Sequence, residues 1–385
     1  MVPRGGLILL LVLSACLQEA DTLGPPPPPQ LAGCAFGETI DASEVPTCLL
    51  SRHVLSQSDA DSAARVIGQA TGLKDYFYND TGLTSFTKAA DLARALSRMG
   101  DYYSRGLFAD SARFHRLIDH LLVTIESTRG PIRSIGGRLW PQTTPFLAWH
   151  KYPIVGYFFQ PVETVQSMGF PLPRPTAPTD SIVNISEHLY SYAVWRSFRG
   201  HRLPYWEYDF PFSTAGIQLI PPWVSGMAQG STLFLFTEAL KRTGDATWRS
   251  RGSDVLRSMI ISWDEGGVLL PDTSHGYWFE EYHPTAQVWN GGAQALVSVG
   301  YYSSVTGDTM ANRIFQRGIE AIKYYTPIYD TGTWTLYSRI EGYNSRFYHN
   351  FEIQLLDQLY TLSGDAWFKG TADRWRSYIP PAGVQ

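Results

Sequence analysis

Apolar and polar positions follow a helical period in four segments of the chain, and a Gly-Asp pair divides each segment into two helices. These segments are residues 95–122, 236–260, 298–322 and 356–379. Glycine suits the left-handed residue that ends a helix, and an aspartate directly after it can cap the helix that follows. The last three aspartates, Asp245, Asp308 and Asp365, recur at similar intervals. The pattern therefore predicts a repeated helical hairpin.

The segments between the hairpins show strand-like alternation or β-forming aromatic residues. They are residues 203–210, 266–272, 276–282 and 332–339, and the stretch 213–216 can turn a hairpin between the first of them and "IQLI". We predict a mainly α fold, an α/α toroid of helical hairpins, in which short β-hairpin excursions form the active-site cleft. An open α/α solenoid without a pocket is the alternative.

Composition divides the chain into four regions. Residues 1–16, "MVPRGGLILLLVLSAC", have one arginine, a short apolar run and small residues before a cysteine, as in a lipoprotein-type signal peptide. Residues 17–50 contain "GPPPPPQ" and are predicted to be a Pro-rich linker. Residues 51–203 are predicted to be the N-terminal helical region of the toroid, and residues 204–385 its C-terminal domain.

The cysteines bear on the location of the protein. The motif "LSAC" is similar to a bacterial lipobox, which would make Cys16 the lipid-bearing first residue of the mature chain. A plain signal peptide with an incidental cysteine is the alternative. We expect an exported protein of the bacterial cell envelope that contacts the membrane only through this lipid anchor. Cys34 and Cys48 either pair as a disulfide or remain two buried thiols, and both alternatives stay open.

Composition and charge narrow the ligand class. The chain is 14% aromatic, and its formal net charge is −4. Exposed aromatic side chains in grooves are common platforms for sugar rings, and no global basic field favours nucleic acid. An anionic ligand would therefore have to be held by local arginines. The sequence leaves a homodimer open.

The sequence contains no common metal or cofactor motif. It has no HExxH, paired CxxC, EF-hand loop, GxSxG elbow or phosphate-binding GxxxxGK[ST], so we expect no metal and no cofactor. What remains is a set of tyrosines beside polar residues: Tyr282 follows two glutamates, Tyr337 precedes Ser338-Arg339, and Tyr348 lies between Arg346 and His349. A phenol has a pKa of about 10, and adjacent arginines favour its anionic form.

Four motifs in the second half of the chain occur in a distinctive order. They are "PPWVSGMAQG" at 221–230, "WFEEYHP…VWNG" at 278–291, "YTPIYDTGTWTLYS" at 325–338 and "RFYHNFEIQLLDQL" at 346–359. Together they resemble the C-terminal domain of the D-glucuronyl C5-epimerases, enzymes that convert glucuronate to iduronate in heparan-type chains, and indicate a bacterial homologue. The animal enzymes carry a β-rich domain before this one, whereas residues 55–200 read as mainly helical here.

The resemblance implies the site residues. The three essential tyrosines of the family match Tyr282, Tyr337 and Tyr348. The implied substrate-binding residues are Ser225, Gln229, Glu281, Asn290, Arg339, Arg346 and His349. Two positions depart from the family pattern: Arg339 follows the second tyrosine more closely than usual, and Phe347 replaces an aspartate.

The implied reaction inverts C5 of D-glucuronate to L-iduronate within a heparosan-like polysaccharide. One tyrosine removes the C5 proton and another returns a proton to the opposite face, with Tyr348 and Tyr282 in these two roles. Tyr337 holds the intermediate or shares a proton. Arg339 and Arg346 are expected to neutralise the substrate carboxylate, because charge develops there when the proton leaves.

Three other classes of protein compete with the epimerase. A uronate polysaccharide lyase removes the same proton and then expels the neighbouring sugar. A glycosidase would need a carboxylate pair, either Glu207 with Asp209 or Glu280 with Glu281, but adjacent carboxylates on one strand point apart. A non-catalytic glycan-binding lipoprotein would need only the aromatic side chains.

Overall fold

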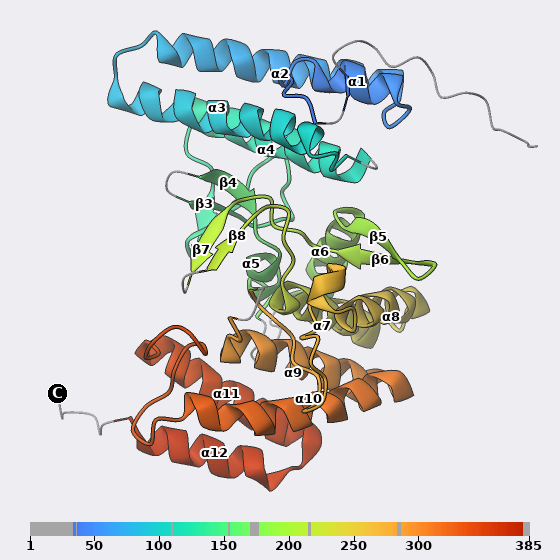
Figure 1. The fold of residues 1–385 in the computed structure, drawn as a ribbon, viewed down its shortest axis with the longest axis vertical. Helices are drawn as coiled ribbons and strands as arrows, with labels where there is room; N and C mark the ends of the chain where they lie inside the picture. The colour runs from blue at the N-terminus through green and yellow to red at the C-terminus, as the bar shows by residue number, and fades with distance from the viewer. Residues whose placement is uncertain are drawn as a thin grey trace, which may run out of the picture.

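The computed structural model describes most of the chain from Cys34 onward. The described residues are 34–35, 37–108, 111–152, 155–169, 177–214, 217–282 and 286–379. The predicted signal peptide, the lipidation site at Cys16 and residues 17–33 of the predicted linker lie outside them. Within the described residues twelve α-helices and several short antiparallel strands confirm a mainly α fold (Figure 1). No helix in this part of the chain has the length and apolarity needed to cross a bilayer.

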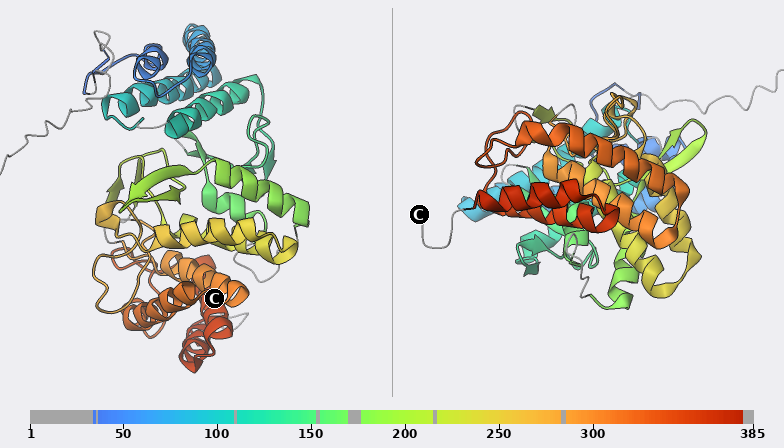
Figure 2. Two further views of the ribbon diagram at one scale, coloured as in Figure 1. Left: turned by 90° about the vertical axis from the view of Figure 1, so that its right-hand side faces the viewer. Right: turned by 90° about the horizontal axis from the view of Figure 1, so that it is seen from below.

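The first four helices form a unit with its own core, which we call the N-terminal helical unit. They are α1 (Val45–Ser51), α2 (Gln57–Tyr78), α3 (Leu83–Ser104) and α4 (Ser111–Arg129). Most of their buried apolar side chains, together with Cys34 and other residues outside the helices, form one hydrophobic cluster. The left view of Figure 2 places this unit at one end of the molecule and the last helices at the other.

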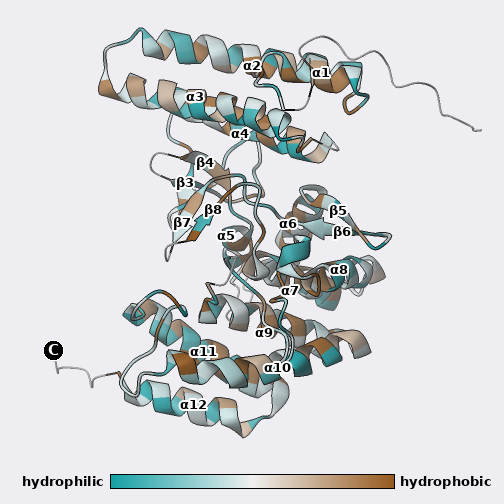
Figure 3. Ribbon diagram, viewed as in Figure 1, coloured by the Kyte–Doolittle hydropathy of each residue, from teal (hydrophilic) through white to brown (hydrophobic). Residues whose placement is uncertain are grey.

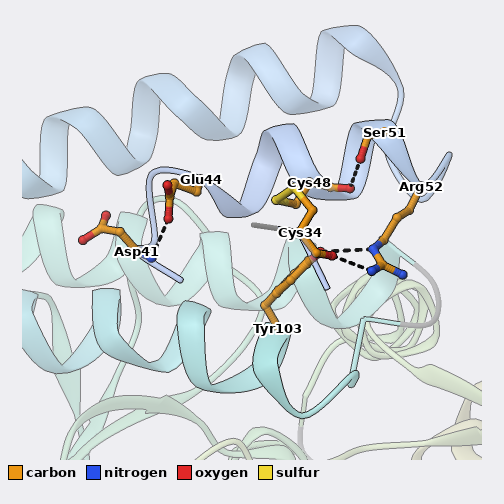
Figure 4. Close-up of a disulfide and its surroundings, with 7 residues drawn as sticks. All are labelled: Cys34, Asp41, Glu44, Cys48, Ser51, Arg52 and Tyr103. Atoms are coloured by element: carbon orange, nitrogen blue, oxygen red, sulfur yellow. Dashed lines mark hydrogen bonds between the residues drawn. A yellow bond between two sulfur atoms is a disulfide. The ribbon is translucent and has the colours of Figure 1, made fainter. Parts of the chain in front are cut away.

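Cys34 and Cys48 form a disulfide bond, which settles the two alternatives left open by the sequence (Figure 4). The carbonyl oxygen of Cys34 accepts hydrogen bonds from Tyr103 Oη at 2.6 Å and from Arg52 Nη2 at 2.5 Å. Cys48 lies on α1, whose Val45 and Leu49 are buried in the same cluster. The described part of the range 17–50 is therefore folded onto the N-terminal helical unit.

The first of the four predicted Gly-Asp breaks is wrong. Helix α3 runs through Gly100 and Asp101 without interruption and ends at Ser104, and the left-handed residue is Gly106, with φ 67°. A Cβ at Gly100 would lie 2.5 Å from the carbonyl oxygen of Ile40. Glycine is present here because the preceding chain packs directly on α3.

The middle of the chain contains a sheet that the sequence analysis missed. Its strands are β1 (Ser134–Ile135), β2 (Arg138–Leu139), β3 (Trp149–Tyr152) and β4 (Gly156–Phe159), paired antiparallel in that order. The helices α5 (Pro161–Gln166) and α6 (Thr179–Ser191) follow it. The strands β1 to β4 therefore fall within the range 51–203 that was predicted to be helical, and α4 packs on β4.

Two β-hairpins precede the last helices. They pair β5 (Val194–Phe198) with β6 (His201–Tyr205), and β7 (Phe212–Thr214) with β8 (Ile217–Leu219). The predicted hairpin that includes "IQLI" is confirmed by the pairing of β7 with β8, but the strand opposite "IQLI" is β7 and not the stretch 203–210. Residues 215–216 of the predicted turn lie outside the described residues. The other predicted strand-like stretches form only isolated bridges, such as Leu269 with Phe279 and Leu336 with Tyr343.

The last six helices form three hairpins. They are α7 (Gly226–Thr243) with α8 (Ala246–Met259), α9 (Trp289–Thr306) with α10 (Thr309–Tyr329), and α11 (Arg346–Ser363) with α12 (Ala366–Ser377). The three predicted Gly-Asp breaks are confirmed: each glycine ends its helix with φ between 66° and 70°, and each aspartate side chain caps the next helix. Helix α9 is buried almost throughout and packs on α7, α10 and α11 (Figures 1 and 3). Closure of the hairpins into a toroid stays a prediction.

A buried ion network joins α4 to the segment between β6 and β7. Arg113 donates two hydrogen bonds of 2.8 Å to the fully buried Glu207 carboxylate, and Arg196 adds a third of 2.8 Å. Arg116 donates to Asp209 Oδ2 at 2.5 Å. Burial alone would raise the pKa of Glu207, but the surrounding arginines hold it at about 2. Each carboxylate is tolerated in the interior because it has a guanidinium partner at hydrogen-bond distance, although burial still raises the pKa of Asp209.

Replacement of Arg116 tests how much this network contributes to the free energy of unfolding. Arg116→Leu leaves Asp209 buried without its ionic partner, and we expect the free energy of unfolding to fall by about 3–5 kcal/mol in urea titrations. The matched control is Arg105→Ala, which removes a half-exposed ion pair with Asp101 in the same unit. It should cost at most about 1 kcal/mol. Equal losses in the two variants would contradict the account.

Candidate active site

The three tyrosines implied by the resemblance meet in one place, although they come from three separate segments. Tyr282 follows the bridge at Phe279, Tyr337 follows the bridge at Leu336, and Tyr348 lies in the first turn of α11. The ring centroids of Tyr337 and Tyr348 are 5.1 Å apart. The Tyr282 hydroxyl interacts with both the Tyr337 hydroxyl and the Glu281 carboxyl. We call these four residues the tyrosine cluster.

Two neighbouring cavities open on the tyrosine cluster. The first cavity has a volume of about 230 Å³, and Glu281, Tyr282 and Tyr348 are among its lining residues. The second cavity has a volume of about 480 Å³, and Tyr337 and Tyr348 line it. Tyr348 belongs to both linings, so the cluster lies where the two cavities adjoin.

One side of the first cavity is built from stacked aromatic rings, which we call the aromatic wall. It consists of Tyr208, Phe210, Phe212 and Trp223. The rings of Tyr208 and Trp223 stack at 4.0 Å with an interplanar angle of 10°. Tyr152 stacks on Phe210 at 4.7 Å from the neighbouring sheet. Such flat apolar surfaces beside polar groups suit the faces of sugar rings.

The aromatic wall is held in place by the ion network. Tyr208 lies between Glu207 and Asp209, and its backbone pairs with Trp223 in an antiparallel bridge. In extended chain alternate side chains point in opposite directions. The two carboxylates therefore face the arginines while Tyr208 faces the cavity. Since both carboxylates are bound by arginines, this pair cannot serve a glycosidase as acid and nucleophile.

Burial keeps the phenols of the cluster protonated. It raises the pKa of Tyr282 well above its ordinary value, and the nearby Glu281 and Tyr337 raise it further. Burial likewise raises the pKa of Tyr337 and of Tyr348, again with a contribution from Glu281. The expectation that adjacent arginines favour the anionic phenol is therefore wrong for this structure.

Glu281 titrates closest to neutral pH within the cluster. Burial raises the pKa of its carboxyl to about 7, the hydrogen bond from Tyr282 lowers it, and Glu341 raises it again. A Cβ at Gly291, in the first turn of α9, would lie 2.3 Å from Glu281 Oε2. Glycine at this position lets α9 approach the carboxyl closely. Glu280 points elsewhere and accepts a hydrogen bond from the Gln287 backbone N–H at 3.0 Å.

The predicted arginines lie apart from the cavities. Within the described residues neither Arg339 nor Arg346 lines the first or the second cavity. Arg339 donates instead to Gln287 Oε1 at 3.0 Å. Arg339 lies in a loop and Arg346 at the start of α11, where side-chain direction depends on backbone geometry and tertiary contacts. Proximity to a tyrosine in sequence therefore did not place these arginines in the cavities.

Of the other implied substrate-binding residues, one lines a cavity and the rest are buried outside both cavity linings. Ser225 lines the first cavity and caps α7. Gln229 is fully buried. Its side-chain Nε2 donates hydrogen bonds to Pro204 O and Ser258 Oγ, and its Oε1 accepts one from the Trp206 backbone N–H. Asn290 is buried at the start of α9 outside both linings. Gln229 therefore supports the site from behind and does not face it.

His349 is also a supporting residue and not a surface for substrate. It is fully buried and stacks on Trp334 at 3.9 Å. Its Nε2 lies 3.0 Å from the Trp375 carbonyl oxygen, an acceptor, so this nitrogen carries the proton. Nδ1 then accepts from Thr335 Oγ1 at 2.8 Å, which in turn accepts from Asn344 Nδ2 at 2.7 Å. This directed chain fixes the loop that carries Tyr337 to the helix that carries Tyr348.

Several lining residues were not singled out from the sequence. They are Tyr152, Gln160, Glu163, Phe212 and Trp223 in the first cavity, and Thr214, Glu341, Tyr343 and Ser345 in the second. The sequence marked the region 203–210 as aromatic and strand-like, but it gave no sign that residues 152–166 approach it. Within the described residues no group of three or more His, Cys, Asp or Glu could hold a metal ion.

Comparison with known proteins gives the family of the second half of the chain. Residues 200–377 match the family model described as D-glucuronyl C5-epimerase C-terminus. A protein of Methanocaldococcus jannaschii described as "Uncharacterized protein MJ1128" is 27% identical over 177 residues, which are 44% of this chain and 56% of that protein. The D-glucuronyl C5-epimerase of Caenorhabditis elegans is 26% identical over 216 residues, which are 50% of this chain and 35% of the relative. The match therefore spans about half, or less, of the length of these relatives.

Replacement of Gly291 tests the close approach of α9 to Glu281. Because the added Cβ meets the Glu281 carboxyl, Gly291→Ala should displace Glu281 and reduce the free energy of unfolding by about 1–3 kcal/mol in urea titrations. The matched control is Gly370→Ala in α12, where a Cβ meets no atom within 4 Å. That change should leave stability unchanged or raise it by up to about 1 kcal/mol. A Gly291→Ala protein as stable as the control would refute the packing described here.

Proposed function

Because residues 200–377 belong to the D-glucuronyl C5-epimerase C-terminal family, we propose that this chain is an epimerase that inverts C5 of D-glucuronate residues to L-iduronate within a polysaccharide. The observation that carries the proposal is the meeting of Glu281, Tyr282, Tyr337 and Tyr348 where two cavities adjoin. A heparosan-like chain is the substrate class that the resemblance implies. Export and attachment through Cys16 stay predictions, since that part of the chain lies outside the described residues.

The first step needs a base that works near neutral pH. The raised pKa values of the three phenols make them poor bases alone, whereas the Glu281 carboxyl with a pKa of about 7 can accept a proton. In the proposed step Tyr282 takes the C5 proton while its own hydroxyl proton passes to Glu281. The electron pair of the broken C–H bond moves toward the substrate carboxylate, where hydroxyl donors stabilise the developing charge.

The second step needs a donor on the other face of the ring. In the proposed step Tyr348, which lines the first cavity together with Tyr282, gives its hydroxyl proton to C5. This transfer completes the inversion and leaves a Tyr348 phenolate. Tyr337 adjoins Tyr348 and interacts with Tyr282. The proton held by Glu281 can therefore return to Tyr348 through Tyr282 and Tyr337. This sequence of transfers consumes no cofactor and restores every group to its starting state.

The two main alternatives predict different products. A lyase would use the same first step and leave an unsaturated sugar that absorbs ultraviolet light. A glycan-binding protein would use only the aromatic wall and leave the chain unchanged. A glycosidase is disfavoured because Arg113, Arg116 and Arg196 bind the Glu207–Asp209 pair.

Deuterium exchange tests the proposed reaction directly. In deuterium oxide the protein should introduce deuterium at C5 of N-acetylheparosan and produce iduronate signals by NMR, with no new ultraviolet absorbance. Tyr348→Phe should lower the rate of iduronate formation by about 100-fold or more, because the donor to the opposite face is lost, while Tyr282 can still exchange the C5 proton on its own face. The control is Tyr360→Phe on the same helix, whose ring is half-exposed outside both cavity linings. Absorbance with chain shortening, or iduronate formation at the full rate in Tyr348→Phe, would rule the proposal out.

The pH dependence of the exchange tests the role of Glu281. The pKa of this acid is raised to about 7, so below pH 7 the carboxyl is protonated and cannot accept a proton. The rate per enzyme should therefore rise as pH increases through about 7 and level off above it. Glu281→Gln should remove this rise and lower the rate by about 100-fold. A rise centred on the ordinary glutamate value of about 4.3 would argue against this base.

A further inference from the structure

Glu352 is a buried carboxyl that neither the ion network nor the proposed reaction uses. It lies on α11 one turn after Tyr348, and its side chain is fully buried. Within the described residues neither of its carboxyl oxygens has a hydrogen-bond partner, and the same holds for the buried Oδ1 of Asn344 in the loop before α11. Buried oxygen atoms without hydrogen bonds are costly, so these groups call for a physical explanation.

Glu352 meets the loop that carries Tyr337. The polar side chains beside it are those of Asn344 and Thr335. These two residues hold the ends of the loop together, because the Asn344 backbone N–H donates to the Thr335 carbonyl oxygen at 2.9 Å. Glu352 therefore stands where the segment of Tyr337 contacts the helix of Tyr348.

The hydrogens of these neighbouring side chains are already used. Asn344 Nδ2 donates one hydrogen to Thr335 Oγ1 at 2.7 Å and the other to a backbone carbonyl oxygen of the same loop at 3.2 Å. The Thr335 hydroxyl gives its single hydrogen to His349 Nδ1 at 2.8 Å, because the ring proton is on Nε2. Asn344 and Thr335 therefore offer Glu352 acceptor oxygens and no donor. An ionised carboxylate at this place would meet only lone pairs.

The charged groups of the surrounding helices do not compensate a charge on Glu352. Helix α11 packs on α9 and α12. Helix α9 contains no charged residue, and the lysine and both arginines of α12 are paired with aspartates. Within the described residues Glu352 thus has no cation to offset the cost of burying its charge.

The titratable groups nearest to Glu352 favour its neutral form or are themselves neutral. They are Tyr329 at the end of α10, whose pKa is raised by burial and also by Glu352, and His349 one turn earlier on α11, whose pKa is lowered by burial. Burial raises the pKa of Glu352 to about 8, although the Asn344 and Thr335 side chains act to lower it. The direction of this shift agrees with the hydrogen-bond geometry.

We propose that Glu352 is a positioning residue that stays protonated in the folded chain and donates its carboxyl hydrogen to Asn344 Oδ1. This bond gives the buried acid an acceptor and gives Asn344 Oδ1 its missing donor. It also extends the chain of hydrogen bonds that runs from Asn344 through Thr335 to His349. The loop of Tyr337 is thereby fastened to α11 at a further point. The bearing of this bond on catalysis rests on the proposed function, whereas the bond itself does not.

The pH dependence of stability tests the protonation. Glu352→Gln keeps the size of the side chain and an N–H donor but cannot ionise. An unfolded glutamate has a pKa of about 4.3. Between this value and the folded value of about 8, the folded chain holds a proton that the unfolded chain has lost, so the stability of the unmodified chain falls as pH rises. Below and above this range the contribution is constant.

Urea titrations measure the unfolding constants of the unmodified chain and of Glu352→Gln from pH 5 to pH 9. Their ratio should rise about tenfold per pH unit up to about pH 8 and then level off. The matched control is Asp357→Asn on the same helix, where a half-exposed carboxylate pairs with Arg376, and its ratio should stay nearly constant. A ratio for Glu352→Gln that does not change with pH would overturn the inference.

Hydrogen–deuterium exchange of the backbone tests the positioning. Glu352→Leu fills the space but removes the donor, so the peptide that contains residues 335–344 should exchange at least about tenfold faster at pH 7. In Glu352→Gln this peptide should exchange as slowly as in the unmodified chain. Equal exchange in all three proteins, or equally fast exchange in both variants, would overturn the inference. If Glu352→Leu does not fold, the pH dependence of Glu352→Gln decides alone.

Iduronate formation by the unmodified chain separates this inference from the proposed function. The expected pH dependence and loop protection, without any iduronate, would support the Glu352 hydrogen bond and overturn the epimerase. Iduronate formation with a constant ratio of unfolding constants would support the epimerase and overturn the Glu352 hydrogen bond.

Discussion

The structure depends on the contact between two arginines of α4 and the carboxylates of Glu207 and Asp209. Arg113 and Arg116 reach from the N-terminal helical unit into the segment between β6 and β7, where they bind charges that would otherwise be intolerable in the interior. Tyr208 lies between the two carboxylates and forms part of the aromatic wall. The segment Glu207-Tyr208-Asp209 thus joins the two halves of the molecule and shapes the first cavity. The N-terminal helical unit is for this reason part of the support of the site, although it contributes no residue to the tyrosine cluster.

The chemistry of the cluster follows from burial more than from neighbouring cations. Removal from water raises the pKa of all three phenols and of Glu281, and no arginine lines the cavities to oppose this effect within the described residues. One group, Glu281, is thereby brought into the range where it can exchange protons near neutral pH. The phenols remain donors, which is the state needed for handing a proton from one face of a sugar ring to the other. A hydrogen-bond chain through His349, Thr335 and Asn344 holds the segments of Tyr337 and Tyr348 together.

Local signals in the sequence were enough for some features and not for others. Three Gly-Asp breaks were predictable because a helix end is decided by a few adjacent residues, as Gly244 with Asp245 shows. The helix break predicted at Gly100 was wrong because glycine is needed there for a close contact with Ile40, which is distant in sequence. The tyrosines were found through ordered motifs, whereas Arg339 and His349 were misplaced because only tertiary packing sets where their side chains point. The sheet over residues 134–159 was missed because strands of two to four residues leave almost no periodic pattern.

The central claim is that Glu281 is the group of the cluster that changes protonation near neutral pH. The most direct measurement is a carbon-13 NMR titration of the glutamate carboxyl carbons in the full chain, with the Glu281 resonance assigned by its loss in Glu281→Gln. The account predicts a midpoint at about pH 7 for this resonance. A midpoint at the ordinary value of about 4.3 would show a solvated carboxylate and would contradict the account.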